Sequence, residues 1–180
     1  MKHNETPGKL GRPKKMSSST TEPFPTAVLT ISDSCARCEK EDLSGPAVAQ
    51  TIQKYNFAVS AQEIVGDEQQ AIEQKLITLC AHARLVLTTG GTGISARYVT
   101  PEATRAVCDR LVEGIPELMR SEGLKKTRFS ALSRALCGTR GRSLILNLPG
   151  SPKGAVESLE AVVDFLPHML DLLDGHTSHN

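Results

Sequence analysis

The chain has 180 residues, of which 39% are hydrophobic and 23% charged, and its formal net charge is +1. This length suits one globular domain with a single sizeable core, and the small charge provides no field that attracts nucleic acid or acidic membranes. Aromatic residues make up 3% and Trp is absent, which disfavours a surface that stacks single-stranded bases. No apolar run reaches the roughly 18 residues of a membrane-spanning helix, and no apolar segment follows the N-terminus as in a secretory signal.

The two ends of the chain differ from its middle. The first 24 residues are rich in lysine, serine, threonine and proline, and such a segment buries too little apolar surface to offset the entropy of ordering. We therefore expect a disordered tail over 1–24, one domain over 25–175 and a C-terminal tail over 176–180. The basic stretch 11–15 is typical of a solvated tail. Contact with a DNA minor groove is the alternative interpretation, and a steep salt dependence of DNA binding would test it.

The first part of the domain predicts two strands around a helix. The apolar run 27–31 is typical of a strand buried on both faces. After a polar loop, Ser44 predicts an N-cap and Pro46 a first helical turn, for a helix that ends near residue 55. Residues 57–64 alternate in part and predict a second strand.

The middle of the domain continues the alternation of strands and helices. Asp67 has the capping-box spacing to Gln70, and apolar residues recur at helical spacing over 72–83. Residues 84–89 predict a strand, and Thr100 followed by a proline predicts the start of a helix that ends near residue 111.

The last third predicts short helices over 115–123 and 129–136 and a strand over 143–148. A long helix over 154–173 follows and ends near Gly175. Strands separated by helices indicate a three-layer, doubly wound α/β fold, with a mostly parallel sheet and helices on both faces.

Three polar or glycine-rich loops follow strands of this predicted sheet, at 32–44, 90–100 and 149–153. Ligands of such sheets bind at the carboxyl ends of the strands, where the strand order reverses. We therefore expect the three loops to meet on one rim and to form the binding site.

Each loop offers groups that bind polar ligands, and each has a simpler explanation. Ser32, Asp33 and Ser34 can bind a polar ligand or form an Asx or Ser/Thr turn that satisfies the end of the strand. The glycines of the run 88–93 allow successive N–H groups to form an anion-binding nest, although no lysine follows as in a standard P-loop. A plain tight turn is the alternative for this run.

The third loop, 147–153, again joins an apolar strand to a helix. Its amides and Lys153 suit a phosphate or pyrophosphate, whereas an ordinary strand-to-helix turn is the alternative. Asp67 also has two interpretations, because it can cap a helix or hold Mg²⁺ against nucleotide phosphates. The pattern alone favours the cap.

Five cysteines are present, and two of them, Cys35 and Cys38, have the spacing of half a zinc site or of a redox pair. A structural zinc ion needs four ligands, and neither a second cysteine pair nor a histidine cluster supplies them, since His176 and His179 lie in the C-terminal tail. The odd number of cysteines favours a reducing, cytoplasmic location.

Three long segments together resemble the Mog/MoaB family of molybdopterin adenylyltransferases. The string TISDSCARCEKEDLSGP over 30–46 is similar to the first family signature, a strand followed by S-D and then D-x-S-G-P. The string LTTGGTGISARYVTPEAT over 87–104 resembles T-T-G-G-T-G…D-V-T-P-E-A-T. The string ALSRALCGTRGRSLILNLPGSPK over 131–153 resembles L-S-R…G-x-R-G-x-S-L-I-x-N-L-P-G-x-P. The match extends over about residues 25–174.

The resemblance implies the molybdenum cofactor biosynthesis protein fold, a homotrimer with a hexamer as a further possibility, and binding of molybdopterin. It also implies transfer of AMP from Mg-ATP to the terminal phosphate of molybdopterin, with release of pyrophosphate. The product is then the acceptor for molybdate insertion by an enzyme of the MoeA type. Mg²⁺ is the implied cofactor, ATP and molybdopterin are the implied substrates, and neither nucleic acid nor a membrane is an implied partner.

The resemblance also assigns roles to individual positions. Asp67 is the acidic residue near the nucleotide and the metal, and Glu102 is a further polar contact near the nucleotide. The implied substrate-binding residues are Ser32, Asp33, Ser34, Gly90, Gly91, Thr92, Gly93, Ser133, Asn147, Pro149, Gly150, Ser151 and Lys153.

One position departs from the family pattern. The aspartate that the family has immediately before V-T-P is Tyr98 here, and tyrosine supplies no carboxylate to Mg²⁺ at neutral pH. Either another acid (Asp33, Asp42 or Glu102) replaces it at the catalytic site, or the chain is a pterin-binding or scaffolding protein without efficient adenylylation.

Overall fold

The structure is a computed structural model and describes residues 22–175. Six strands form one sheet in the order β2-β1-β3-β6-β5-β4. The strands β2, β1, β3 and β6 are parallel, whereas β5 runs antiparallel to β6 and β4 to β5. The expected mostly parallel α/β sheet is therefore confirmed. The strands are β1 (Phe24–Ile31), β2 (Phe57–Val65), β3 (Leu85–Thr89), β4 (Arg110–Leu111), β5 (Cys137–Arg140) and β6 (Ser143–Leu148).

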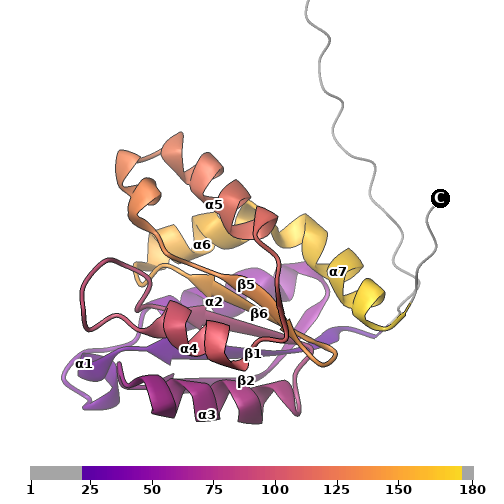
Figure 1. Ribbon diagram of the computed structural model, residues 1–180, viewed down its shortest axis with the longest axis horizontal. Coiled ribbons are helices and arrows are strands. Elements are labelled where there is room, and N and C mark those ends of the chain that lie inside the picture. The colour runs from indigo at the N-terminus through magenta and orange to yellow at the C-terminus, as the bar shows by residue number, and fades with distance from the viewer. Residues whose placement is uncertain (1–21, 176–180) are drawn as a thin grey trace, which may run out of the picture.

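Helices cover both faces of the sheet (Figure 1). On one face lie α3 (Gln69–Cys80) and α4 (Thr100–Val107). The opposite face carries α2 (Ser44–Ile52), α5 (Gly114–Leu124), α6 (Pro152–Glu160) and α7 (Leu166–Leu173). The short elements are α1 (Asp33–Ala36) and the 3₁₀ turns η1 (Gln53–Tyr55), η2 (Arg128–Leu132) and η3 (Val163–Phe165).

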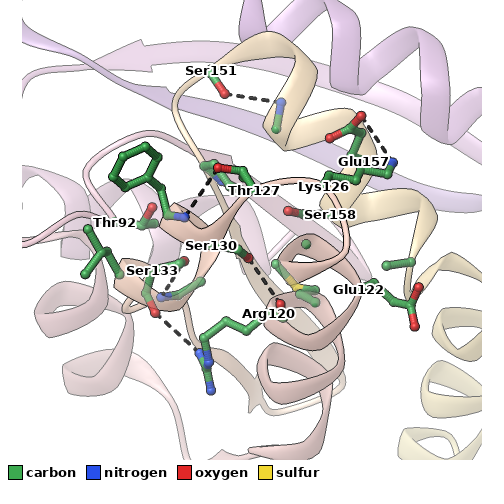
Figure 2. Close-up of a pocket in the computed structure, with 18 of the residues that line it drawn as sticks. Thr92, Arg120, Glu122, Lys126, Thr127, Ser130, Ser133, Ser151, Glu157 and Ser158 are labelled. Atoms are coloured by element: carbon green, nitrogen blue, oxygen red, sulfur yellow. Dashed lines mark hydrogen bonds and ion pairs between the residues drawn. The ribbon is translucent and has the colours of Figure 1, made fainter.

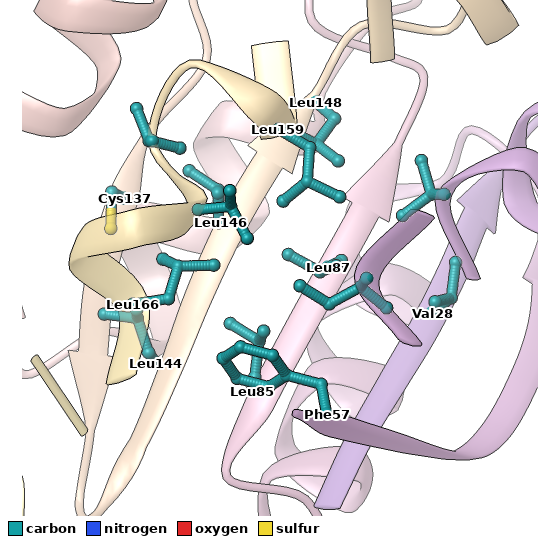
Figure 3. Close-up of a cluster of buried hydrophobic side chains, with 14 of the residues drawn as sticks. Val28, Phe57, Leu85, Leu87, Cys137, Leu144, Leu146, Leu148, Leu159 and Leu166 are labelled. Carbon is teal, nitrogen blue, oxygen red and sulfur yellow. The ribbon is translucent and has the colours of Figure 1, made fainter. Parts of the chain in front are cut away.

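The alternation of side chains along the central strands builds two cores. On β3, Leu85 and Leu87 face α2 and α6 while Val86 faces α3 and α4. Figure 3 shows the larger core, in which side chains of β6 and β3 meet Leu159 of α6 and Leu166 of α7. Because both faces are buried, the strands read as continuous apolar runs, and this makes the sheet a rigid base for the loops at its carboxyl edge.

The structure corrects three expected helices. The predicted helix 154–173 is divided into α6, η3 and α7. The cause is Pro167, which lacks the N–H that a continuous helix needs and therefore lies in the first turn of the new helix α7. The predicted helix 129–136 is the 3₁₀ turn η2, which leads into β5. The helix that starts at Thr100 ends at Val107 rather than near residue 111, because β4 follows it.

The expected tails lie mostly outside the described residues. The basic stretch 11–15 and both His176 and His179 belong to the undescribed segments 1–21 and 176–180, so the disorder expected of the tails stays a prediction. The folded domain includes Phe24, the last residue of the expected tail, because this residue is buried and begins β1. Within residues 22–175, no helix combines the length and apolar character needed to cross a bilayer.

Candidate functional site

The three expected loops meet at the carboxyl edge of the sheet. β1 lies between β2 and β3. The chain therefore connects β1 first to the strand on one side, β2, and then to the strand on the other side, β3. This reversal of strand order between β1 and β3 is the switch point where such sheets bind ligands. In Figure 1, α1 and the loop before α4 lie at the same end of the sheet. A cavity of about 660 Å³ opens there, lined by residues of all three loops.

Asp33 and Asp67 bind one another's backbone at this edge. The amide of Asp33 donates to Asp67 Oδ2 at 3.1 Å, and the amide of Asp67 donates to Asp33 Oδ1 at 2.9 Å. These reciprocal bonds fix both carboxylates in the cavity wall. The predicted helix cap is therefore wrong, because Asp67 makes no capping bond and the position before α3 is Glu68, without a side-chain cap.

One oxygen of Asp67 remains free. Asp67 Oδ1 is buried and accepts no hydrogen bond within residues 22–175. Burial raises the pKa of Asp67 above its ordinary value, because a carboxylate out of water disfavours its charged form. The second carboxylate has an ion partner, since Asp33 Oδ2 pairs with Arg97, an exposed residue of the loop after β3.

Ser32 and Ser34 explain how the loop after β1 turns. Ser32 Oγ accepts the amide of Cys35 at 3.3 Å and caps α1, and the two serine hydroxyls lie 3.1 Å apart. Both residues also line the cavity. The turn and the ligand-binding interpretations of this loop are thus compatible, since both serines form the turn and line the cavity.

Asp42, rather than Ser44, caps α2. Asp42 Oδ1 accepts the amides of Ser44 and Gly45, both at 3.0 Å, and Oδ2 accepts the Thr30 hydroxyl at 2.6 Å. A buried chain of hydroxyls continues from Ser44 Oγ to Thr89 Oγ1 at 2.8 Å. The ends of β1 and β3 and the start of α2 are therefore tied together in the wall of the cavity.

The glycine-rich loop has the backbone that an anion nest requires. Gly90 and Gly91 have φ of 96° and 63°, a region that favours glycine. The Thr100 hydroxyl donates to the Gly90 carbonyl at 3.0 Å and holds the loop. The amides of residues 91–93 donate to no acceptor within the described chain, so they are available to a phosphate.

A second cavity of about 540 Å³, shown in Figure 2, adjoins the first, as their shared lining residues indicate. Its walls come from α5, η2 and α6, and they include apolar side chains such as Met119 and Phe129. Two cations contribute as well, and both have partners: Arg120 donates to the carbonyl of Ser133 at 3.5 Å, and Lys126 pairs with Glu157 at 3.1 Å. The two cavities share part of their lining, namely Thr92, Gly93, Gly150 and Ser151.

Two loops touch at the junction between the cavities. A Cβ at Gly150 would lie 3.2 Å from the Cα of Gly90, so a side chain there would push the loops apart. Ser151 Oγ accepts the amide of Gly154 at 3.2 Å and caps α6. The amino-terminal end of α6, with its partial positive charge, therefore points at the junction.

Arg134 is a supporting residue that sequence reasoning missed. Its Nε donates to the carbonyl of Gly93 at 2.9 Å, a terminal nitrogen donates to that of Tyr98 at 2.6 Å, and the guanidinium pairs with Glu102. It thereby fixes the loop 93–98 from outside. The signal is the arginine of the L-S-R motif, which directly follows Ser133.

Several expected site residues lie elsewhere. Glu102 lines neither cavity. Burial opposes its ionisation, but the hydrogen bond and charge of Arg134, a backbone hydrogen bond and the charge of Arg105 together outweigh burial and lower the pKa of Glu102. Lys153 is exposed and also lines neither cavity, whereas Pro149 lines the second. Tyr98 lies at the polar cavity with 42% of its surface exposed.

Asn147 lies in the buried core. It is fully buried, donates to Thr88 Oγ1 at 3.0 Å and Thr104 Oγ1 at 2.8 Å, and accepts the amide of Leu136 at 3.1 Å. Both hydrogens of the side-chain nitrogen and the side-chain oxygen of Asn147 are therefore engaged within the protein. It therefore fixes the edge of β6 beneath the third loop and reaches neither cavity.

The cysteines form no metal site among the described residues. Cys35 and Cys38 are free thiols, and no three His, Cys, Asp or Glu residues within 22–175 gather as metal ligands. Burial raises the pKa of Cys80 and Cys108 to about 11 and that of Cys137 to about 12. These three thiols are consequently protonated and unreactive at neutral pH.

Comparisons with known proteins agree with this architecture. Residues 27–168 match the family model described as "Probable molybdopterin binding domain". A molybdopterin adenylyltransferase of Helicobacter pylori is 44% identical over 153 residues, which is 83% of this chain and 87% of that protein. Molybdenum cofactor synthesis protein cinnamon of Drosophila melanogaster is 40% identical over 154 residues, 84% of this chain but only 26% of its own length.

A solved structure shares the fold as well. The molybdopterin biosynthesis enzyme MoaB of Thermus thermophilus is 49% identical and superposes with a TM-score of 0.80, covering 84% of this chain and 97% of its own. The resemblance found in the three sequence segments is thus confirmed over most of the domain. This chain belongs to the molybdopterin-binding family of molybdenum cofactor biosynthesis proteins.

Proposed function

We propose that this chain transfers AMP from Mg-ATP to the terminal phosphate of molybdopterin and releases pyrophosphate. One observation carries the proposal: two adjoining cavities of different character share a wall of the glycine-rich loop and the start of α6. A reaction between two bound molecules needs such a junction, because holding both reactants in line replaces a bimolecular encounter. The name of the Helicobacter pylori relative supports the reaction class.

The polar cavity suits the nucleotide phosphates. The free amides of residues 91–93 and the guanidinium of Arg97 lie in its wall. Backbone N–H groups and arginine bind phosphate oxygens without any change of protonation. The second cavity offers Met119 and Phe129 to a flat heterocycle, and Arg120 and Lys126 to its polar substituents. We assign the pterin to this cavity, with its phosphate directed at Gly150 and Ser151.

The chemical step joins two anions, so the site must neutralise charge and align the reactants. A phosphate oxygen of molybdopterin attacks the α-phosphorus of ATP, the bond to the bridging oxygen breaks, and pyrophosphate leaves with that electron pair. The amides of the glycine-rich loop and the amino-terminal end of α6 face the oxygens that gain charge. No side chain forms a covalent bond to phosphorus in this scheme.

The carboxylates fit the expected Mg²⁺. Asp67 Oδ1 is buried without a partner among the described residues, and an orphaned carboxylate oxygen is costly unless a cation or donor occupies it. Mg²⁺ is usually held by one or two carboxylates together with substrate phosphates, so Asp67 is the residue that would hold it. The ion would offset the negative charge of the nucleotide phosphates.

Tyr98 motivates the second candidate, a pterin-binding protein with little turnover. Tyr98 lies at the polar cavity and supplies no carboxylate. The deciding assay incubates the wild type and Tyr98→Asp with molybdopterin and Mg-ATP and measures adenylyl-molybdopterin and pyrophosphate. Product from the wild type supports the transferase, and absence of product at high enzyme concentration contradicts it. Tight pterin binding with turnover only in Tyr98→Asp would establish the second candidate.

We also propose that the chain works in the cytoplasm as a homotrimer, with a hexamer as the alternative assembly. The adenylylated product then passes to a molybdate-inserting enzyme of the MoeA type. Light scattering coupled to size exclusion measures the assembly, and a monomeric mass would contradict this part of the proposal. Nucleic acid and membranes have no part in the scheme.

A further inference from the structure

Four acidic residues line the polar cavity: Asp33, Glu41, Asp42 and Asp67. Asp42 is fully engaged, since its two oxygens accept the Thr30 hydroxyl and the amides at the start of α2. Glu41 is exposed, and none of the described residues hydrogen-bonds to its side chain. Neither residue therefore offers a carboxylate that is both free and held in place.

Asp33 and Asp67 differ from the other two acids because the backbone holds them as a pair. Each carboxylate accepts the amide of the other residue, at 2.9 and 3.1 Å, although 34 positions separate them in sequence. One oxygen of each is thereby fixed and the second remains for another partner. Among residues 22–175, the second oxygen of Asp67 is the buried Oδ1, which has no partner, and that of Asp33 is Oδ2, whose partner is Arg97.

Arg97 is a replaceable partner. Its side chain is 69% exposed, whereas that of Asp33 is 23% exposed, and an ion pair with an exposed partner contributes little stability. Arg97 also lies in the loop that continues from the glycine-rich nest. A phosphate bound at the nest therefore competes with Asp33 for the guanidinium of Arg97. Asp33 offers Arg97 only Oδ2, because its Oδ1 accepts the amide of Asp67, whereas a phosphate can offer two oxygens to the guanidinium.

We propose that Asp33 is the second carboxylate of the divalent-cation site, beside Asp67, and that Arg97 covers Asp33 until nucleotide phosphates draw the guanidinium away. The proposal rests on the function proposed above. It also explains how the chain can dispense with a carboxylate at position 98, because the two preorganised acids come from the loops after β1 and β2 instead. Nucleotide and cation then bind cooperatively, since each removes a contact that hinders the other.

The test measures Mn²⁺ binding by electron paramagnetic resonance, with and without an ATP analogue in which a methylene group replaces the α–β bridging oxygen. This analogue cannot release pyrophosphate, so binding is separated from turnover. With the analogue, Asp33→Asn and Asp67→Asn each weaken Mn²⁺ binding about tenfold or more, while the control Glu41→Gln, an acid of the same cavity, stays within about twofold. Asparagine retains an oxygen for the reciprocal amide bond, and a thermal melt verifies folding of each variant.

Arg97→Gln gives an opposite and independent result. Without nucleotide, the loss of the covering guanidinium makes Mn²⁺ binding about two- to fivefold tighter than in the wild type. The variant also binds the ATP analogue more weakly than the wild type does, because the guanidinium that would contact the phosphates is gone. Unchanged Mn²⁺ binding in Asp33→Asn, weaker nucleotide-free binding in Arg97→Gln, or no Mn²⁺ binding by the wild type with the analogue would each overturn the proposal.

Failure of this inference is distinguishable from failure of the proposed function. A wild type that binds Mn²⁺ and the analogue through Asp33 but forms no adenylyl-molybdopterin contradicts the function and supports the site. A wild type that forms product while Asp33→Asn binds Mn²⁺ normally supports the function and refutes the site.

Discussion

The two adjoining cavities are built in different ways. The polar cavity is held by bonds that involve backbone: the reciprocal amides of Asp33 and Asp67, the Asp42 cap of α2 and the Thr100 hydroxyl on Gly90. The second cavity depends on side chains of α5, η2 and α6, among them Phe129, which is 66% exposed. Its two cations are held by a long hydrogen bond and a partly exposed ion pair.

This difference indicates a division of labour. Charge neutralisation at a phosphate tolerates little displacement of the neutralising groups, and the polar cavity has the fixed backbone that this requires. Recognition of a heterocycle depends on contact area, which side chains can adjust on binding. We therefore expect variants of the polar cavity to affect the rate and variants of the second cavity to affect pterin affinity.

The largest expected effect comes from Asp67→Asn, which removes charge from the rigid cavity. Loss of one such electrostatic group lowers the rate about 100- to 1000-fold. We expect this loss in kcat for AMP transfer, with the Kd for molybdopterin within about twofold, as measured by product formation and fluorescence titration. The neighbouring exposed Glu68→Gln is the matched control. A large loss of pterin affinity in Asp67→Asn would contradict the separation of the two cavities.

The next effect tests the support beneath the rigid cavity. Asn147→Ala leaves the Leu136 amide and the hydroxyls of Thr88 and Thr104 without their buried partner. We expect a loss of about 2–3 kcal/mol in the free energy of unfolding, measured by urea denaturation. Gln62→Ala, on the exposed side of β2, is the control and changes stability by less than about 0.5 kcal/mol. A near-neutral Asn147→Ala would mean that the amide does not support the edge of β6.

A smaller effect is expected in the second cavity. Phe129→Ala removes aromatic contact with the pterin worth about 1 kcal/mol, so the KM for molybdopterin rises about fivefold while kcat and the KM for ATP change little. Steady-state kinetics with each substrate varied in turn measure this. Leu172→Ala, an exposed apolar residue of α7, serves as the control. An increase in the KM for ATP instead would reverse our assignment of the cavities.

The smallest effect concerns stability against pH. Burial raises the pKa of Asp67 above the ordinary value of 3.8, so the folded state binds this proton more tightly than the unfolded state does. Folding is therefore penalised once the carboxylate ionises, and the penalty disappears as the pH falls below the ordinary value. We expect Asp67→Asn to have a higher Tm than the wild type at pH 7 and an equal Tm at pH 3.5. Equal Tm values of the wild type and Asp67→Asn at pH 7 would show that ionisation of the buried carboxylate does not lower the stability of the folded state.

Sequence patterns identified the long, buried elements but not the short or interrupted ones. The run 27–31 and the strand 143–148 were predicted because burial on both faces makes them continuously apolar. The strands β4 and β5 are too short to display a period of two. The prediction of a single helix over 154–173 was wrong because the apolar residues keep their helical spacing past Pro167, whereas the hydrogen bonds of the helix are interrupted there.

For the site, the sequence determined which loops carry the chemistry. Strand ends rich in glycine, threonine and aspartate, together with three ordered family motifs, led to the polar rim and the molybdopterin-binding family. These signals are local, because strand burial, turns with positive φ and motif spacing are all properties of adjacent residues. Only the tertiary structure decided the roles within the rim. It made Asp67 a partner of Asp33 rather than a helix cap, placed Asn147 in the core and gave Arg134 its supporting contacts, because each of these roles depends on bonds between residues at least 11 positions apart.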